Sequence, residues 1–279
     1  MKLCDVYEKL DAVAPKALSD ALCAKFSYYD NSGILVDTGD EIKGVLFTLD
    51  LTQAALDHAK KAGTNLIVTH HPVIYGKISD LRVNDFEPLD SKLIDAVKNG
   101  ISIVSMHLNL DIAGGGIDES LMKAVRIAAA IEGDNAQSVA LIGKGETQYM
   151  QAVENGAYGR AYGVNATTLS ALAKNLEKVL CTNRVQTYGD MNLPIKKAAS
   201  FCGAGGDENA VRFAVEQGAD VIISSDFKHH VLALAVEKGL AVITLTHYAS
   251  EQYGFEKYYQ KIRESIELPC VYHTDEILL

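Results

Sequence analysis

The stretch GTNLIVTHHP, residues 63–72, places an apolar, β-branched strand between a helix-ending glycine and two histidines. The same order of helix, Gly, apolar strand and metal-binding type of side chain occurs four times. Each helix with its strand takes roughly twenty residues, as in βαβ units, and Gly tolerates the left-handed backbone found after many helix ends. The pattern predicts an α/β fold with mostly parallel or mixed sheets. The four strands lead from Gly63 to His70 and His71, from Gly100 to His107, from Gly218 to Asp226, and from Gly239 to His247.

The repeated units are interrupted by a stretch of different character. Helical patterns at 117–131 and 167–180 enclose a strand-like segment at 139–143 and a hairpin pattern around Asn155 and Gly156. We therefore expect two α/β lobes, with a metal site in the cleft between them. The first lobe comprises residues 1–125, completed by about 225–279, and the second comprises residues 126–224.

The composition excludes several classes of protein. A formal net charge of −10, with no run of five basic residues, argues against an extended contact with nucleic-acid phosphates. Five cysteines without a Cys-x-x-Cys spacing support neither a disulfide framework nor a thiolate zinc site, and they fit a reducing compartment. No stretch reaches the roughly 18 uninterrupted apolar residues of a membrane span. We expect a cytoplasmic protein that contacts neither membrane nor nucleic acid.

The adjacent histidines His70 and His71 are the sharpest local signal. Neighbouring side chains on a strand point to opposite faces, so both imidazoles can converge only where the strand has ended and the backbone turns. Pro72 favours such an ending because it removes a ladder donor and keeps His71 extended. The alternative is that one histidine caps the strand end and the other is solvated.

Two further pairs repeat one spacing at strand ends. His107 and Asp111 stand four residues apart, as do His247 and Glu251. On a helical turn this offset places an imidazole and a carboxylate on the same face, and both are ligands for Zn, Mn or Fe. The alternatives are a His–Asp hydrogen bond that organises a loop, and a Glu that favours the positive end of a helix.

A fourth cluster, SSDFKHH at residues 224–230, leaves more than one role open. Asp226 could ligate a metal, orient a ligand histidine or cap the following helix, and we favour one of the last two roles. One of His229 and His230 is expected to face the site as a proton donor or substrate contact. The glycine-rich residues 201–209 are read as a tight strand-to-helix turn rather than as an anion site.

Taken together, the candidate ligands exceed what one tetrahedral zinc accepts. Two divalent cations that share a water would accommodate them and would activate that water for hydrolysis. The five candidate ligands are His70, His71, Asp111, His247 and Glu251.

These motifs resemble those of the Nif-three-like family, often labelled GTP cyclohydrolase 1 type 2 homologues. The resemblance runs through nearly the whole chain and is carried by YDNSGI at 29–34, IVTHHP at 67–72, His107 to Asp111, the glycines of 203–206, and HYASE at 247–251. It implies a dinuclear metal centre on the five candidate ligands, with His107 beside them, and a ring-shaped homohexamer. Tyr29 and Leu108 depart from the Trp and Thr of the family pattern, which would alter the pocket.

These observations lead to a functional hypothesis. We expect a hydrolase that depends on two divalent metal ions, which could be Zn, Fe or Mn. A hydroxide that bridges the two ions would attack a small-molecule substrate. The candidate reaction is opening of the purine ring of GTP. His107 and His230 are the expected catalytic proton carriers. The alternative is a non-enzymatic metal-binding regulatory or scaffold protein.

Overall fold

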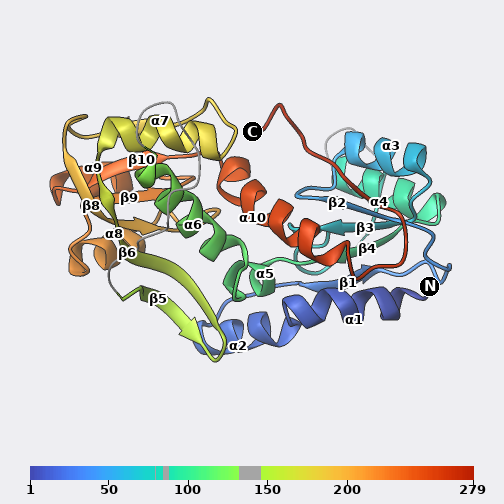
Figure 1. The fold of residues 1–279 in the computed structure, drawn as a ribbon. Coiled ribbons are helices and arrows are strands. Elements are labelled where there is room, and N and C mark those ends of the chain that lie inside the picture. Colours follow the sequence, from blue (N-terminus) through green and yellow to red (C-terminus); the bar gives the residue numbers. More distant parts are fainter. Residues whose placement is uncertain (79, 84–87, 132–145) are drawn as a thin grey trace. The chain divides into compact units, whose positions relative to one another are not determined.

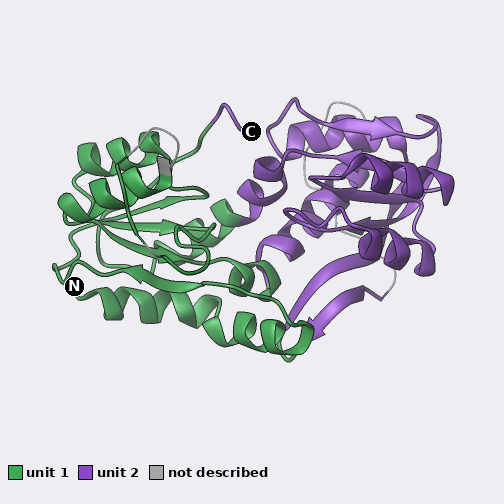
Figure 2. Ribbon diagram, turned by 180° about the vertical axis from the view of Figure 1, so that it is seen from behind, with its two compact units in different colours: residues 1–114, 153–155, 255–275 green, residues 115–152, 156–254, 276–279 purple. Residues whose placement is uncertain are grey.

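The computed structural model describes residues 1–78, 80–83, 88–131 and 146–279 of the chain (Figure 1). Contacts divide the chain into two compact units, coloured separately in Figure 2. The first unit contains residues 1–114, 153–155 and 255–275, and the second contains residues 115–152, 156–254 and 276–279. Among the described residues, no helix has the length and apolar character needed to cross a membrane.

The first unit is built on a five-stranded sheet in the order β1-β4-β3-β2-β11, counted over the described residues. The strands β4, β3, β2 and β11 run parallel, and β1 pairs antiparallel with β4. Because Thr48, Thr69 and Ser105 are register partners, β2, β3 and β4 end at one edge of the sheet. The strands are β1 (Gly33–Val36), β2 (Val45–Thr48), β3 (Leu66–Thr69), β4 (Ser102–Ser105) and β11 (Cys270–Tyr272).

Helices cover both faces of this sheet (Figure 1). Leu46, Ile67 and Ile103 pack with apolar residues of α3 and α4 on one face. On the other face, Phe47 contacts Tyr258 and Tyr259 of α10. This two-sided burial explains why the strands are continuously apolar. The helices of this unit are α1 (Leu3–Val13), α2 (Lys16–Phe26), α3 (Gln53–Ala62), α4 (Pro88–Lys98) and α5 (Leu108–Ile112), and the unit boundary falls within α10 (His247–Ile262).

The second unit contains a six-stranded sheet in the order β5-β6-β8-β9-β10-β7 within the described ranges. Its central strands β8, β9 and β10 are parallel, whereas β6 and β7 flank them antiparallel. The strands are β5 (Gln148–Val153), β6 (Gly156–Thr168), β7 (Gln186–Tyr188), β8 (Pro194–Ser200), β9 (Val221–Ser224) and β10 (Ala241–Thr244), and the helices are α6 (Ile117–Ala130), α7 (Leu169–Val179), α8 (Glu208–Glu216) and α9 (His229–Glu237).

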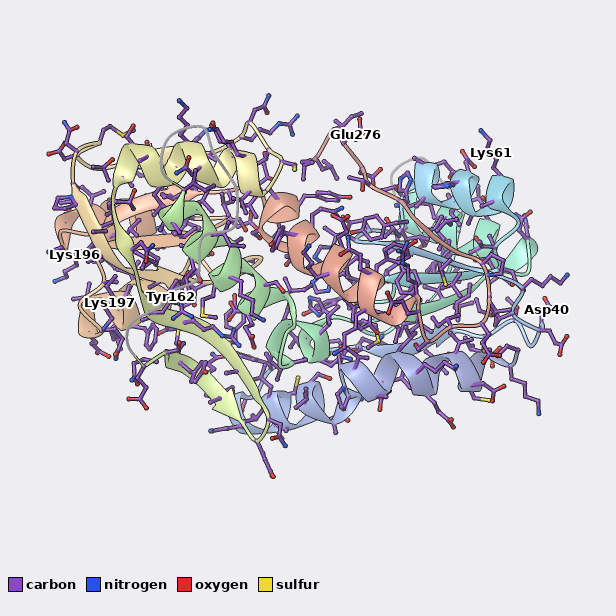
Figure 3. The ribbon with its side chains drawn as sticks, in the orientation of Figure 1. Asp40, Lys61, Tyr162, Lys196, Lys197 and Glu276 are labelled. Atoms are coloured by element: carbon purple, nitrogen blue, oxygen red, sulfur yellow. The ribbon has the colours of Figure 1, made fainter. Side chains whose placement is uncertain are left out.

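Adjacent residues of β6 show how the second sheet is covered on its two faces. Ala161 packs in a core with residues of α8 and α9. The next side chain, Tyr162, points to the opposite face, where Arg126 of α6 lies over its ring. Figure 3 labels Tyr162 on this sheet. Its hydroxyl donates to Ser200 Oγ at 2.8 Å, so the polar end of this fully buried ring is satisfied.

The structure confirms the predicted α/β class with mixed sheets. The four helix-ending glycines, Gly63, Gly100, Gly218 and Gly239, all have positive φ between 64° and 83°. The hairpin turn lies at Glu154 and Asn155, one residue before the expected Asn155 and Gly156, because β6 already begins at Gly156; the segment 139–143 lies outside the described residues. Residues 225–254, expected in the first lobe, cluster with the second unit, because β10 pairs with β9 and β9 pairs with β8.

Candidate metal centre

The first unit gathers three imidazoles at the edge where β2, β3 and β4 end. The amide of His71 donates to the carbonyl of Leu49, and that of His70 donates to both Thr48 and Leu49. This shared acceptor means that the backbone has left the regular ladder and turns, so the two rings lie only 4.8 Å apart between centroids. The two imidazoles thus converge where the strand has ended and the backbone turns, as expected from the sequence.

His107, which follows β4, completes this group. Its ring centroid lies 5.2 Å from that of His70 and 5.9 Å from that of His71. One nitrogen from each of the three rings lies within 4.8 Å of the others, a spacing that would allow them to hold a metal ion. His70 is fully buried, whereas His71 and His107 are partly exposed. We call His70, His71, His107 and Asp111 the first cluster.

Each ring of the first cluster is held through its Nδ1 atom by an oxygen. His70 Nδ1 lies 2.8 Å from the carbonyl oxygen of Met106, and His71 Nδ1 lies 2.8 Å from Asp50 Oδ1. His107 Nδ1 lies 2.7 Å from Asp30 Oδ1. Because these oxygens can only accept, each Nδ1 carries the proton and donates, which leaves Nε2 as the basic nitrogen. This arrangement is typical of metal-binding histidines.

Asp111 faces His70 from α5. The helix begins directly after His107, whose carbonyl accepts the Asp111 amide at 2.9 Å, so the predicted turn with a four-residue offset is present. Asp111 Oδ1 lies 3.6 Å from His70 Nε2, and both side chains are buried. Two ligands at about 2.1 Å from one tetrahedral ion are roughly 3.4 Å apart. The basic nitrogen and the carboxylate are therefore spaced as two ligands of one cation.

The carboxyl group of Asp30, which holds His107 of the first cluster, has a lowered pKa. Burial by itself would raise the pKa of its carboxyl group, but the hydrogen bonds from His107, Ser32 and Asn31 lower the pKa to about 2. Ser32 Oγ donates to Asp30 at 2.6 Å and accepts the amide of His107 at 3.2 Å. Asp30 is thus ionised near neutral pH and fixes the orientation of His107.

The second unit holds a separate group at the end of β10. His247 Nδ1 lies 2.5 Å from Asp226 Oδ2, and His247 Nε2 lies 3.2 Å from Glu251 Oε1. Glu251 is buried, with 4% of its side chain exposed. His247 is therefore held as the three other histidines are, with its Nδ1 tied to an oxygen and its Nε2 facing a carboxylate. We call Asp226, His247 and Glu251 the second cluster.

The structure selects among the roles considered for Asp226. The N-cap position of α9 is Lys228 and not Asp226, so the capping role is wrong. The carboxylate of Asp226 instead orients His247. Asp226 has a positive φ of 56°, which is uncommon for a residue with a side chain and marks a locally constrained backbone.

The glycine-rich segment 201–209 supports the second cluster. As expected, it turns from β8 to α8, and Asp207 caps that helix by accepting the amide of Ala210 at 2.8 Å. The Gly203 amide donates to Ser250 Oγ at 2.9 Å, and Ser250 in turn donates to the His247 carbonyl. A β-carbon at position 203 would overlap Glu251 Oε1, so the turn can lie against this carboxylate only with Gly there.

His230 takes part in a different contact. Its Nε2 atom lies 2.8 Å from Glu208 Oε1, and the two side chains are 64% and 54% exposed. The structure therefore joins His230 to α8 rather than to the residues of the second cluster.

Two of the side chains that orient the histidines, Asp30 and Asp50, were not predicted from the sequence. The position of Asp50 could have indicated its role, because it follows the end of β2 as the histidines follow the ends of β3 and β4.

The donor atoms of both clusters fit a divalent metal. Imidazole nitrogen and carboxylate oxygen are ligands that Zn, Mn and Fe accept, and the orienting oxygens behind the rings are those of metal sites. The described residues thus contain His, Asp and Glu groups able to bind metal ions.

A family model described as Duf34/NIF3 (NGG1p interacting factor 3) matches residues 1–275. The chain belongs to this family. Curated relatives of this Duf34/NIF3 protein carry the name GTP cyclohydrolase 1 type 2 homolog. The one from Clostridium perfringens is 29% identical over 268 residues, which cover 96% of this chain and 93% of the relative. The one from Methanocaldococcus jannaschii is 26% identical and covers 97% and 98%.

Solved structures share the fold of this Duf34/NIF3 protein. A Bacillus cereus protein related to NIF3 superimposes with a TM-score of 0.75 at 17% identity, covering 97% of this chain and 96% of its own. A Staphylococcus aureus protein described as hypothetical has a TM-score of 0.75 at 25% identity, covering 99% and 97%. The family resemblance predicted from the motifs is confirmed.

Proposed function

We propose that this Duf34/NIF3 protein is a divalent-metal-dependent hydrolase with a paired metal centre. The observation that carries the proposal is a common arrangement of four histidines. In His70, His71, His107 and His247, Nδ1 is tied to a carboxylate or carbonyl oxygen, so that Nε2 is the basic atom. A metal ligand needs an unprotonated ring nitrogen, and each of these rings presents one at Nε2.

The proposed ligands are the five that the sequence predicts, His70, His71, Asp111, His247 and Glu251. Five ligands are more than the four protein ligands of a closed zinc site. Five ligands divided over two ions would leave coordination positions for water and substrate, as catalytic sites require. This excess of ligands is the reason for proposing a pair of ions rather than one.

Bound there, two cations would lower the pKa of a coordinated water and stabilise negative charge in a hydrolytic transition state. The chain's own residues would hold and move the protons. His107, with its Nδ1–H donated to Asp30, presents Nε2 as a base in the first cluster. The ionised Asp30 stabilises the imidazolium that forms when His107 accepts a proton, and it fixes the ring orientation.

The name carried by the relatives makes a guanine nucleotide the first substrate to test. We propose a small-molecule substrate of nucleotide type and hydrolytic opening of its ring. A homohexameric assembly and a cytoplasmic location remain predictions. Sedimentation of the purified protein and fractionation of cells would test them.

The test begins with elemental analysis of protein purified without added metal. We expect about two equivalents of one divalent ion per chain. His70→Ala should lose bound metal and the hydrolysis of GTP, while His58→Ala, which removes an imidazole outside both clusters, should keep both. Thermal melting of each variant controls for folding.

A folded wild-type protein with almost no metal, or with metal but no turnover of any nucleotide, would contradict the hydrolase. Such a result favours the alternative, a metal-binding regulatory or scaffold protein. In that case His70→Ala would retain the binding of a protein partner.

A further inference from the structure

Two exposed aromatic side chains lie against each other in the first unit. Tyr29 is 52% exposed and Tyr75 is 65% exposed. Their ring centroids are 5.5 Å apart, and the rings meet edge to face at 86°. Single exposed aromatics are common on protein surfaces, but two rings held in contact while half or more of each stays exposed form a defined apolar surface. We call these two residues the tyrosine pair.

Hydrogen bonds between two chain segments fix the tyrosine pair. Tyr75 Oη donates to the carbonyl of Tyr29 at 3.4 Å. Asn31 lies two residues after Tyr29, and its Nδ2 donates to the carbonyl of Ile74, the residue before Tyr75, at 2.7 Å. The two rings are therefore presented by a cross-linked backbone rather than by independent loops. Such preorganisation lowers the entropy that is lost when a ligand binds.

The same two segments supply the first cluster. Tyr29 directly precedes Asp30, whose carboxylate holds His107, and Tyr75 follows His71 by four residues. The hydrogen bond between Asn31 and Ile74 thus couples the aromatic surface to the backbone that positions two of the three imidazoles. A ligand that rests on the tyrosine pair would be held by the segments that carry the metal-binding side chains.

The geometry of the pair indicates what kind of group it accepts. An edge-to-face contact covers one face of one ring and leaves the remaining faces for other partners. Stacking on aromatic side chains is the general way in which proteins hold nucleobases, because every base has a π-face. The carboxylates Asp30 and Asp50 beside the histidines disfavour an anionic group at the same place, so the planar part of a ligand suits this surface better than its phosphates.

We propose that Tyr29 and Tyr75 form a stacking platform for the planar heteroaromatic ring of the substrate, a ring of the nucleobase class. The assignment rests on the proposed hydrolase function, whose substrate it specifies further. The two tyrosines are positioning residues, because they hold the ring without taking part in bond making. Their loss should therefore raise KM and leave kcat nearly unchanged.

The chain contains 13 tyrosines and no tryptophan, which allows a direct test by fluorescence. Tyr29→Trp places a single indole reporter in the pair. The control is Tyr188→Trp, which places an indole at a 36% exposed position of β7 in the second unit. Both variants are titrated, after removal of metal with a chelator, with guanosine, ribose and tetramethylammonium.

We expect guanosine to quench Tyr29→Trp saturably and to quench Tyr188→Trp only in proportion to its concentration. Adding Tyr75→Ala to Tyr29→Trp should raise the dissociation constant for guanosine roughly 5- to 150-fold, the range of one stacking contact. An unchanged dissociation constant, or equal binding of ribose, would overturn the platform. Tighter binding of tetramethylammonium would assign the pair to cation recognition instead and would also overturn it.

Failure of the platform can be told apart from failure of the hydrolase. Saturable quenching by guanosine without turnover in any metal-loaded preparation would leave the platform standing and reject the hydrolase. Turnover of a nucleotide by Tyr75→Ala with wild-type KM and kcat would leave the hydrolase standing and reject the platform. The melting temperature of Tyr75→Ala checks that the fold is intact.

Discussion

The α-carbon of Gly203 lies directly against the carboxylate of Glu251, where any β-carbon would overlap Oε1. The φ of Gly203 is +56°, a left-handed conformation that already disfavours other residues. Ser250 accepts a hydrogen bond from the amide of Gly203, and its position between His247 and Glu251 in α10 connects the turn to both proposed metal ligands. The glycine-rich segment thus determines where the carboxylate of Glu251, a proposed ligand, can lie.

Gly203→Ala tests this relationship. The added methyl group must displace the Glu251 carboxylate, so metal affinity should fall roughly 10- to 100-fold, as when a group that orients a ligand is removed. Gly218→Ala is the matched control, because Gly218 has a similar φ of +64° with open space around its β-position. Both variants should lose about 1–2 kcal/mol of stability from the left-handed backbone. Equal metal affinity of the two, measured by competition with a chromogenic chelator, would contradict the role of Gly203.

Asp50→Ala tests the oxygens behind the rings. Asp50 holds the Nδ1–H of His71 at 2.8 Å, so its removal frees the ring to rotate and lowers the basicity of Nε2. We expect metal affinity to fall by about 10- to 100-fold with little change in melting of the metal-free protein. Asp57→Ala, at a 63% exposed carboxylate on α3, should leave metal affinity unchanged. If the two variants bind metal alike, His71 does not depend on Asp50.

The low pKa of Asp30 predicts a dependence of stability on pH. Its folded-state pKa of about 2 lies below the ordinary value of 3.8, so the folded protein favours the ionised carboxylate. The resulting stabilisation, about 2 kcal/mol, is present above pH 4 and is lost as the pH falls from about 4 toward 2. Asp30→Asn cannot ionise, so its stability should lack this slope. Urea unfolding of metal-free protein between pH 6 and pH 2.5 measures it.

Asp37→Asn is the control for that measurement, because Asp37 is exposed. The difference in stability between wild type and Asp30→Asn should shrink on acidification, whereas the difference for Asp37→Asn should stay flat. Parallel curves for wild type and Asp30→Asn would mean that the His107 contact does not stabilise the folded state.

A comparison of two histidines tests the assignment of proton transfer. His107 lies in the first cluster and is oriented by a buried carboxylate, so His107→Ala should reduce turnover about 100-fold or more. The imidazole of His230 is exposed and contacts Glu208, and exposed pairs of this kind contribute little. We expect His230→Ala to change turnover less than about threefold. A large loss in His230→Ala, with a normal melting curve, would make His230 a catalytic group after all.

Local patterns were sufficient to predict much of the fold. The glycines that end four helices carry positive φ because the left-handed conformation, which Gly adopts easily, ends the helix and turns the chain toward the next strand. The spacing of His107 and Asp111 is met by α5, and the convergence of His70 and His71 follows from the turn after β3. In each case the interacting residues are neighbours along the chain, so sequence spacing and backbone geometry determine the result.

The contacts that orient the rings could not be predicted in this way. Asp30 is 77 residues from His107 in the sequence, and Asp50 is 21 residues from His71. The tyrosine pair likewise joins residues 46 positions apart. Which distant segments meet depends on strand order and register, and these are set by the burial of all strands together rather than by any one motif.

The sequence by itself therefore determined the kinds of donor atoms, their positions at strand ends, the helix terminations and the family. Only the tertiary structure decided that Nδ1 of each ring is tied to an oxygen, that Asp226 orients His247 rather than capping α9, and that Gly203 faces Glu251. The physical reason is that side-chain identity and local backbone preference are properties of short segments. Tautomer, orientation and close packing depend on partners that folding brings from elsewhere in the chain.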